Sequence, residues 1–475
     1  MKTGLLLAVL AYASLLLGAG LLFRRRLEGL EGFFLASRSL GAPRVAFTLC
    51  ASWIGAASLL VSTDEAYRDG LSAFWIIGLP AVLTLLILLL LAGRIRATTG
   101  SSLSDLMEAR YGPAARHVTT VLIIWYMTVL AASQMAAAGS FLGGLLGTSP
   151  VAGLALAAGL VLVYSGAGGF PALSRIHVIQ FLLLLAGVTG MIVSLGARSP
   201  WAEVRAAAAR LGKSSYFDLL AGADRNLLIA VSFVLAWTIS PIAWQRIQAA
   251  KGERSARRGL AGAAAALALF YSGIVVAGML FLTVHPGGAP GRPLVTVFIS
   301  LGSGPVLGGL LFVTVLAAIL STMDAAVNAG ALTLTSGLLR LRRGRGGAGR
   351  TVTLARVSTA LIAAAAFLTA TRLGDILKTL GLASKIMAEG LFVPGLAALF
   401  MRRKAPWAGL LGLLCGGGHA LLCFLDETGA VSLSLPAWPW SLPLGVGLSA
   451  AGFLAGFVLT FSRKWIKGYR ARREK

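Results

Sequence analysis

Long apolar segments alternate with short polar connections along almost the whole of this 475-residue chain. A helix that crosses a membrane needs about 20 consecutive, mostly apolar residues, so the pattern predicts an all-α polytopic membrane protein with about thirteen transmembrane helices. The predicted spans are residues 4–23, 44–66, 72–93, 118–146, 149–165, 176–196, 227–248, 259–284, 304–325, 352–371, 376–400, 406–424 and 441–461.

Basic residues gather in alternate connections between these spans. Cytoplasmic connections of membrane proteins carry an excess of Lys and Arg. The pattern therefore predicts a multi-pass protein of the cell (inner) membrane, with its N-terminus outside and its C-terminus in the cytoplasm. The residues assigned to the cytoplasmic side are 24–26, Arg94, Arg96, Arg110, Arg116, Arg246, Lys251, Arg254, Arg257, Arg258, Arg340, Arg342, Arg343, Arg345, Arg350, Arg402, Arg403, Lys404 and the tail 463–475.

Composition excludes several other classes of protein. Hydrophobic residues make up 57% of the chain and charged residues only 12%. The formal net charge of +25 could suggest nucleic-acid binding, but the basic residues lie between apolar runs, as topology signals do. Cys50, Cys415 and Cys423 lie in apolar runs without CxxC spacing, so we expect no zinc site and no disulfide framework. The sequence contains no nucleophile–base pattern and no phosphate-binding loop, so nothing in it indicates an enzyme.

Two of the predicted spans are interrupted at corresponding places. The second span contains a small, weakly helix-forming stretch at residues 51–56, and five spans later Pro241 interrupts residues 236–241. Transporters built from inverted repeats place their solute between two such broken helices, near the middle of the membrane. A proline kink and a Gly–Ala packing face are the alternative interpretation of the same residues.

A pair of hydroxyl residues, Ser321 and Thr322, lies inside the apolar span 304–325. Such hydroxyls often donate back to a carbonyl of the preceding helical turn. If they face an unwound segment instead, their oxygens suit Na⁺, a hard cation that prefers oxygen ligands. Both interpretations are open at the level of the sequence.

At these places the chain resembles the sodium:solute symporter family. Four segments carry the resemblance in family order, and together they extend over most of the chain. They are residues 31–40 (EGFFLASRSL), residues 104–112 (SDLMEARYG), Trp244-Gln245-Arg246 with Ala249-Ala250-Lys251, and residues 320–324 (LSTMD).

The resemblance implies a LeuT-type fold of two inverted five-helix repeats with two broken helices. Residues 1–43 would hold an extra N-terminal helix and a cytoplasmic linker, residues 44–400 the ten-helix core, and residues 401–475 two further helices and a basic tail. It also implies transport of Na⁺ as the coupling ion, with no organic cofactor. The implied sodium ligands are the main-chain oxygens of Ala51, Ile54 and Ala318 and the hydroxyls of Ser321 and Thr322.

The chain departs from the family pattern at positions that determine solute and ion. It has Ala57 and Ser58 where sugar transporters carry a Glu–Gln pair, and Trp53 where proline transporters carry an Asp. His177 occupies the position at which members with a second sodium ion have an Asp. We therefore expect one sodium per solute, and we do not transfer the sugar or proline assignments.

Six residues are candidates for binding the solute, and each also has a structural interpretation. Trp53, Ser58, Gln134 and Trp237 could line a pocket or could be packing residues. Lys385 and Glu389, spaced i and i+4 in the eleventh span, could be a mutually satisfied pair or could contact the solute or form part of a gate. His177 could be an interface residue or a proton relay.

The sequence thus predicts a secondary transporter that moves a small organic solute with sodium by alternating access. Proton-coupled or uncoupled transport is the first alternative, and a transporter-like sensor is the second. The expected partners are the small-molecule solute and the lipid bilayer, without nucleic acid, in a protein that is a monomer or a weak homo-oligomer.

Overall fold

The computed structural model describes residues 2–22, 29–98, 100–288, 291–341, 348–372 and 376–473, and these residues are almost entirely helical. The basic connections predicted at residues 24–26 and 342–345 lie outside them. The elements are α1 (Lys2–Leu22), α2 (Gly29–Leu35), η1 (Ala36–Arg38), α3 (Ala42–Trp53), η2 (Ala57–Val61), α4 (Ser62–Asp69), η3 (Gly70–Trp75), α5 (Gly78–Arg96), α6 (Leu103–Tyr111), α7 (Pro113–Leu146), α8 (Pro150–Gly196), α9 (Trp201–Arg210), α10 (Ala223–Thr238), α11 (Pro241–Ala249), α12 (Glu253–Val284), α13 (Leu294–Leu301), α14 (Gly304–Leu341), α15 (Ala348–Ala370), α16 (Ile376–Lys385), η4 (Ile386–Leu391), α17 (Phe392–Phe400), α18 (Pro406–Glu427) and α19 (Leu442–Arg473).

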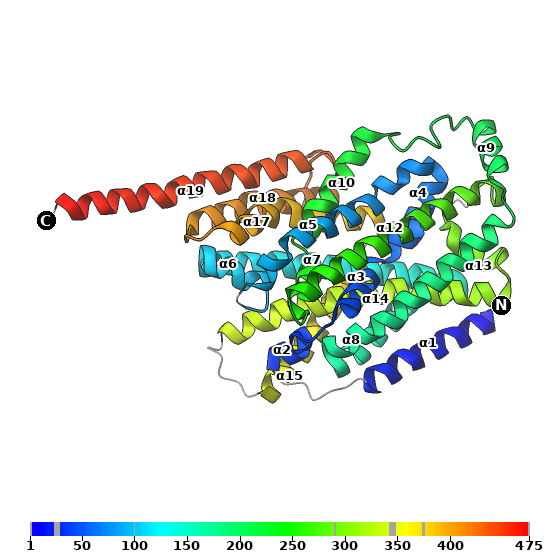
Figure 1. Cartoon of the computed structure of the whole chain (residues 1–475), viewed down its shortest axis with the longest axis horizontal. Coiled ribbons are helices and arrows are strands. Elements are labelled where there is room, and N and C mark those ends of the chain that lie inside the picture. The colour runs from blue at the N-terminus through cyan, green and yellow to red at the C-terminus, as the bar shows by residue number, and fades with distance from the viewer. Residues whose placement is uncertain are drawn as a thin grey trace.

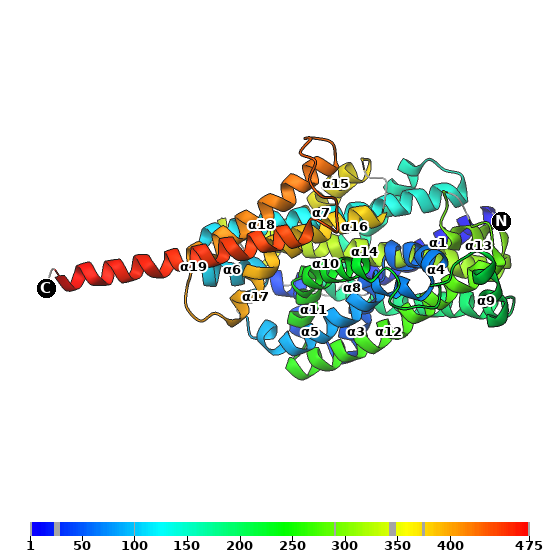
Figure 2. The same cartoon turned by 90° about the horizontal axis from the view of Figure 1, so that it is seen from above.

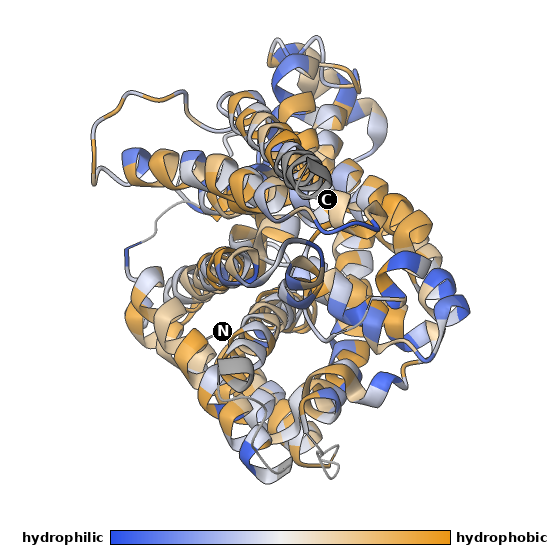
Figure 3. Cartoon of the chain, turned by 90° about the vertical axis from the view of Figure 1, so that its left-hand side faces the viewer, coloured by the Kyte–Doolittle hydropathy of each residue, from blue (hydrophilic) through white to orange (hydrophobic). Residues whose placement is uncertain are grey.

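The long helices form one elongated bundle, with the two chain ends at its opposite ends (Figure 1). Helix α19 extends well beyond the other helices at the C-terminal end, which is also plain after a quarter turn (Figure 2). Seen along the bundle, hydrophobic residues predominate on the outward faces of the helices, and hydrophilic residues gather at helix ends and connections (Figure 3). A bilayer requires this distribution, because apolar side chains face the lipid and polar groups lie where water can reach them.

The prediction of an all-α membrane protein is confirmed, whereas the count of thirteen spans is not. Among the described residues, 10 helices are long and apolar enough to cross a membrane, or up to 11 if the bent pair α10–α11 is one span. Residues 57–96 form one helical run in this count. The break that the sequence predicts in the second span separates α3 from that run, because residues 54 and 55 are not helical.

The predicted spans 149–165 and 176–196 lie in the two arms of α8, which meet at a kink. Gly169, with φ 56° and ψ −163°, and Pro171 interrupt its helical geometry. The first arm packs beside α7, where the space next to Gly139 is filled by the Pro150 carbonyl. The second arm packs beside α14, and its Leu183 carbonyl accepts a hydrogen bond of 3.1 Å from Thr314. The two arms therefore pack against different neighbours.

Both helices that the sequence predicts to be broken are interrupted near their middle. Helix α3 ends at Trp53, and α10 and α11 meet at an angle of 43°. Pro241 begins α11, where its missing N–H costs nothing.

The two broken helices are also tied together at one end of the bundle. Leu40, just before α3, forms a parallel bridge with Ala250, just after α11. The Leu40 N–H donates to the Ala249 carbonyl at 3.0 Å, and the Lys251 N–H donates to the Leu40 carbonyl at 2.9 Å. Arg96 donates to the Ala250 carbonyl at the same place, at 3.2 Å. These bonds join the start of α3 to the end of α11.

Candidate functional site

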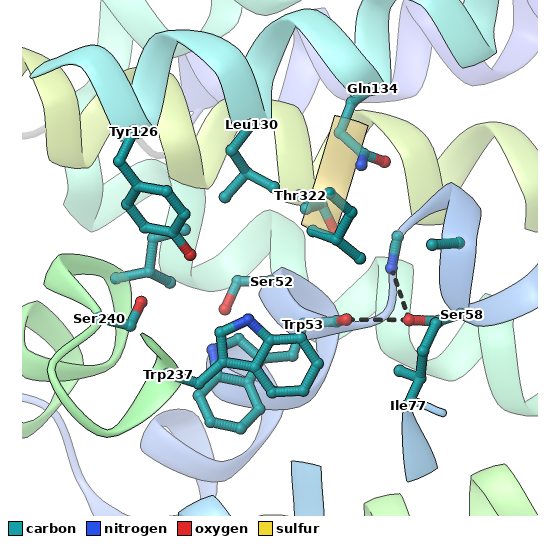
Figure 4. A pocket seen from close by; sticks show the side chains of 14 residues that line it. Ser52, Trp53, Ser58, Ile77, Tyr126, Leu130, Gln134, Trp237, Ser240 and Thr322 are labelled. Carbon is teal, nitrogen blue, oxygen red and sulfur yellow. Dashed lines mark hydrogen bonds between the residues drawn. The ribbon is translucent and has the colours of Figure 1, made fainter. Parts of the chain in front are cut away.

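A cavity of about 40 Å³ lies between the two breaks (Figure 4). A space of this size holds only a few water molecules. The bundle is therefore contracted around the site. The lining residues are Ser52, Trp53, Gly55, Ala57, Ser58, Ile77, Tyr126, Leu130, Gln134, Trp237, Ser240, Ile242, Thr322 and Leu380.

Ser321 joins α14 to the end of α3. Its hydroxyl lies 2.7 Å from the Ala51 carbonyl oxygen and 3.1 Å from the Ala318 carbonyl oxygen. Three of the five predicted sodium ligands therefore meet at one point, and their side chains are fully buried. A cation bound at this point could coordinate the same three oxygens that the hydrogen bonds of the Ser321 hydroxyl now hold together.

Thr322 completes the same corner of the cavity. Its Oγ1 atom is buried and has no hydrogen-bond partner among the described residues. A Cβ added at Gly55 would lie 3.0 Å from this oxygen, so the hydroxyl faces the unwound segment that follows Trp53. A buried hydroxyl oxygen without a partner is costly unless a ligand satisfies it. Ile54, the third main-chain candidate, is the C-cap residue that follows α3.

The first break is stabilised by Ser58 and Gln134, two of the residues that the sequence predicts as candidates for binding the solute. The Ser58 hydroxyl donates to the Trp53 carbonyl at 3.1 Å, accepts from the Gly55 N–H at 3.3 Å, and lies 2.8 Å from the Tyr271 hydroxyl (Figure 4). Gln134 on α7 accepts from the Ala56 N–H at 2.9 Å. These contacts satisfy backbone groups that lose their helical partners at the break. Ser58 and Gln134 therefore have the structural role that was one of their two predicted interpretations.

Two tryptophans, each at the point where its helix breaks, form one wall of the cavity. The rings of Trp53 and Trp237 are 5.6 Å apart and inclined by 44°. Phe233 stacks on Trp237 at 4.9 Å. Figure 4 shows the two indoles overlapping beside Ser52, with Gln134 and Thr322 on the other side of the cavity.

Lys385 and Glu389 do not line this cavity and do not bond to each other. The Lys385 ammonium donates to the Ser441 hydroxyl at 2.7 Å, and Glu389 meets His419 on α18 at 2.7 Å. The chain takes a π-helical turn at η4, in which each turn contains more residues than an α-helix, so the i and i+4 side chains diverge. Both residues face the C-terminal helices.

A second pocket, the charged vestibule, opens at the ends of α4, α16 and α18 and has a volume of about 930 Å³. Its lining includes Asp64 and Glu65. Helix α16 lies between the two spaces, because Leu380 lines the cavity while Ile376 and Leu377 line the vestibule. The remaining charged lining residues are Arg68, Arg225, Arg292, Lys378 and Glu427.

A buried network that the sequence did not predict lies next to Ser321 and Thr322. Asp324, two residues after Thr322, accepts from the Tyr164 hydroxyl at 2.7 Å and lies 2.8 Å from Nε2 of His177. The other ring nitrogen of His177 lies 2.6 Å from the Thr48 hydroxyl. His177 and Asp324 are 147 residues apart, so nothing in the local sequence pairs them.

Arg246 is not a loop residue, although the charge pattern assigns it to a cytoplasmic connection. It is fully buried in α11, with its guanidinium 5.0 Å from the centre of the Phe170 ring. It donates to the Ile242 carbonyl at 3.2 Å and to Gln245 at 2.9 Å. From the sequence alone, every Arg near the end of a span is interpreted as a topology signal. Only the packing shows that Arg246 is an exception.

The fold and the site define a secondary transporter: a helical membrane bundle with two broken helices around an oxygen-lined corner. The chain belongs to the sodium:solute symporter family, whose profile matches residues 33–416. The relatives and neighbours of the chain are transporters and not enzymes.

The similar proteins of known function transport different solutes. The chain is 24% identical to the high-affinity proline transporter PutP of Bacillus subtilis (strain 168), over 84% of this chain and 87% of that protein. It is 30% identical to the sodium/pantothenate symporter of Escherichia coli (strain K12), over 41% of this chain and 42% of that protein. The family therefore leaves the solute open.

Solved structures agree on the fold. A substrate-bound, outward-open Na⁺-coupled sialic acid symporter superposes with a TM-score of 0.76 at 17% identity, over 95% of this chain and 97% of that chain. MhsT in complex with L-phenylalanine gives a TM-score of 0.54 at 15% identity, over 88% of this chain and 99% of that chain. The fold is of the LeuT type, and the protein is a sodium-coupled solute symporter.

Proposed function

We propose that the transported sodium ion binds at the main-chain oxygens of Ala51, Ile54 and Ala318 and at the hydroxyls of Ser321 and Thr322. The observation that carries this proposal is the convergence of the Ser321 hydroxyl with the Ala51 and Ala318 carbonyls. The unpartnered Thr322 hydroxyl beside the same break supports it. All these ligands are neutral oxygens, and a site without a carboxylate holds Na⁺ loosely enough to release it on the other side of the membrane.

The solute site that we propose is the cavity beside this corner, between Trp53 and Trp237 and facing Ser58 and Gln134. None of the described residues that line it carries a charge. A cationic solute would find no counter-charge inside the membrane, and an anionic solute would find only the adjoining Na⁺, so a net charge on the solute is costly. The solute that fits is small, organic and without net charge, with an apolar or planar part to lie on the indoles.

Solute entry requires a change of shape, because the cavity of about 40 Å³ is too small for most organic solutes. Helix α16 is the element that separates the cavity from the charged vestibule, so its displacement opens the path from that end. The bridge between Leu40 and Ala250 closes the path at the opposite end. We propose that the vestibule faces outward and the bridge faces the cytoplasm, with the N-terminus outside and the C-terminus inside the cell membrane.

The path runs within one chain, which supports function as a monomer or weak homo-oligomer.

A thermal-stability screen of purified protein against neutral amino acids, carboxylates, sugars and nucleobases, with and without Na⁺, tests the function. A solute should raise the melting temperature more with Na⁺ present, because the two ligands occupy adjoining sites.

Variants make this screen specific to the proposed pocket. Trp237→Ala should abolish the shift caused by the active solute, and Trp237→Phe should retain part of it. Trp201→Ala, at an exposed position on α9, is the matched control. A solute shift that survives in Trp237→Ala would place the solute elsewhere, and a shift that depends on pH but not on Na⁺ would favour proton coupling.

A further inference from the structure

A cluster of four ionisable residues lies between η4 and the last two long helices, apart from the sodium and solute sites. Glu389 is fully buried, His419 is 7% exposed and Lys385 is 1% exposed. The Glu389 Oε2 atom lies 2.7 Å from Nδ1 of His419, whereas its Oε1 atom has no hydrogen-bond partner among the described residues. Glu427 lies 3.8 Å from the Lys385 ammonium.

The backbone around Glu389 is shaped to admit this side chain. A Cβ at Gly445 on α19 would lie 2.2 Å from the Glu389 carboxylate, and a Cβ at Gly416 on α18 would lie 1.9 Å from the Glu389 carbonyl oxygen. Only glycine permits such close approach. The carboxylate therefore occupies a fitted space between three helical segments, within the membrane-spanning part of the bundle.

The charges of the cluster balance only if it holds one proton. Lys385 and Glu427 offset each other, which leaves the carboxylate of Glu389 against an imidazole that is neutral unless it is protonated. A net negative charge at this depth is costly, and the unpartnered Oε1 atom adds to the cost. One proton on either the carboxyl group or the imidazole makes the cluster neutral.

The cluster has a connection to solvent through Glu427. This residue lines the charged vestibule and also lies beside Lys385 in the buried cluster. Glu427 is therefore the member of the cluster that faces the vestibule. Lys385 is the last residue of α16, the helix that separates vestibule and cavity.

We propose that Glu389 and His419 form a proton-binding site in a cluster whose member Glu427 faces the charged vestibule. The proton binds to the Glu389–His419 pair without breaking any other bond, and the neutral cluster then holds the end of α16 against α18 and α19. The chemical class of the ligand is the proton, and this site is separate from the sodium site of the proposed function.

Other ionisable side chains on the elements around η4 stand in different positions. Helix α18 also carries Cys423, whose sulfur lies 3.7 Å from Nε2 of His419, and Asp426, which accepts main-chain N–H bonds from Leu433 and Leu435. Helix α16 carries Lys378, which lines the vestibule, as do Arg225 of α10 and Glu427. Tyr126 of α7 lies at the cavity. None of these replaces His419 as the direct partner of Glu389.

Two spectroscopic measurements on the purified full-length protein test the site without sodium or solute. Infrared spectroscopy detects a protonated carboxyl group, and nitrogen NMR of labelled histidine detects an imidazolium; the chain has 4 His residues, which simplifies assignment. Both are recorded over about pH 5 to pH 8, where His-linked sites titrate. We expect either a carboxylic-acid band that Glu389→Gln removes, or an imidazolium signal that His419→Gln removes.

The matched control is Glu203→Gln, which changes an exposed carboxylate on α9 and should leave both signals unchanged. The isosteric Glu389→Gln keeps the volume of the side chain, and the wild-type spectra decide the matter even if that variant folds poorly. An ionised Glu389 beside a neutral His419 over the whole pH range would overturn the proposal. Because no sodium is present, this result would leave the sodium site unaffected.

Discussion

Nε2 of His177 lies 2.8 Å from Oδ1 of Asp324, and both side chains are fully buried. The pair joins the second arm of α8 to α14, two residues beyond Thr322, a proposed sodium ligand. His177 stands at the position for which the family resemblance implies an aspartate in members with a second sodium ion. The structure shows that this position is occupied by an imidazole that already has a partner at each nitrogen.

We predict that His177→Ala destabilises the protein strongly, because it leaves Asp324 without one of its two side-chain partners. Removing one member of a buried charged or hydrogen-bonded pair typically costs about 3–5 kcal/mol. The melting temperature of the purified variant in detergent should fall clearly below that of wild type. His177→Gln, which keeps a donor, should lose less, and His117→Ala, at an exposed position of α7, should lose little. A His177→Ala protein that melts like wild type would contradict this structural role.

The same pair predicts a stoichiometry of one sodium ion per solute. A neutral or protonated imidazole cannot replace a carboxylate as a sodium ligand. One charge moving across 100 mV is worth about 2.3 kcal/mol, so the absence of a second ion lowers the maximum solute gradient by roughly 50-fold from voltage alone. Reversal potentials in proteoliposomes measure the ratio directly. A ratio of two sodium ions per solute would contradict the prediction.

Replacement of the two hydroxyl ligands should weaken sodium binding. Ser321→Ala and Thr322→Ala together remove two oxygens and leave the carbonyls, and a lost bond to a charged group costs about 1.5–3 kcal/mol. Two such losses add up to about 3–6 kcal/mol, so we expect the sodium concentration for half-maximal uptake to rise by at least about 100-fold. Thr333→Ala is the matched control, because its hydroxyl lies on the same helix and only donates back to Ala329. An unchanged sodium response in the double variant would remove the site assignment.

The orientation is open to a labelling experiment on two exposed positions. Ser214→Cys, in the connection after α9, should react with a membrane-impermeant thiol reagent added outside intact cells. Arg254→Cys, at the start of α12, should react only after the membrane is permeabilised. The reverse pattern would invert the topology and with it the assignment of the vestibule to the outside.

The sequence by itself determined the elements whose cause is local. Apolar runs of membrane length identify the helices, Pro241 and the weakly helical residues 51–56 mark the breaks, and Ser321 and Thr322 mark the oxygen-rich turn of α14. These features follow from the residues of a single segment, because a membrane forces each segment to satisfy its own backbone bonds.

Only the tertiary structure decided which distant residues meet. The local pattern pairs Lys385 with Glu389 and places Arg246 in a loop, whereas packing turns Lys385 and Glu389 apart at η4 and buries Arg246. The partners of His177 and Glu389 come from other helices. Inside a membrane a polar side chain takes whichever partner the packed helices bring within reach, and no spacing along the chain encodes that choice.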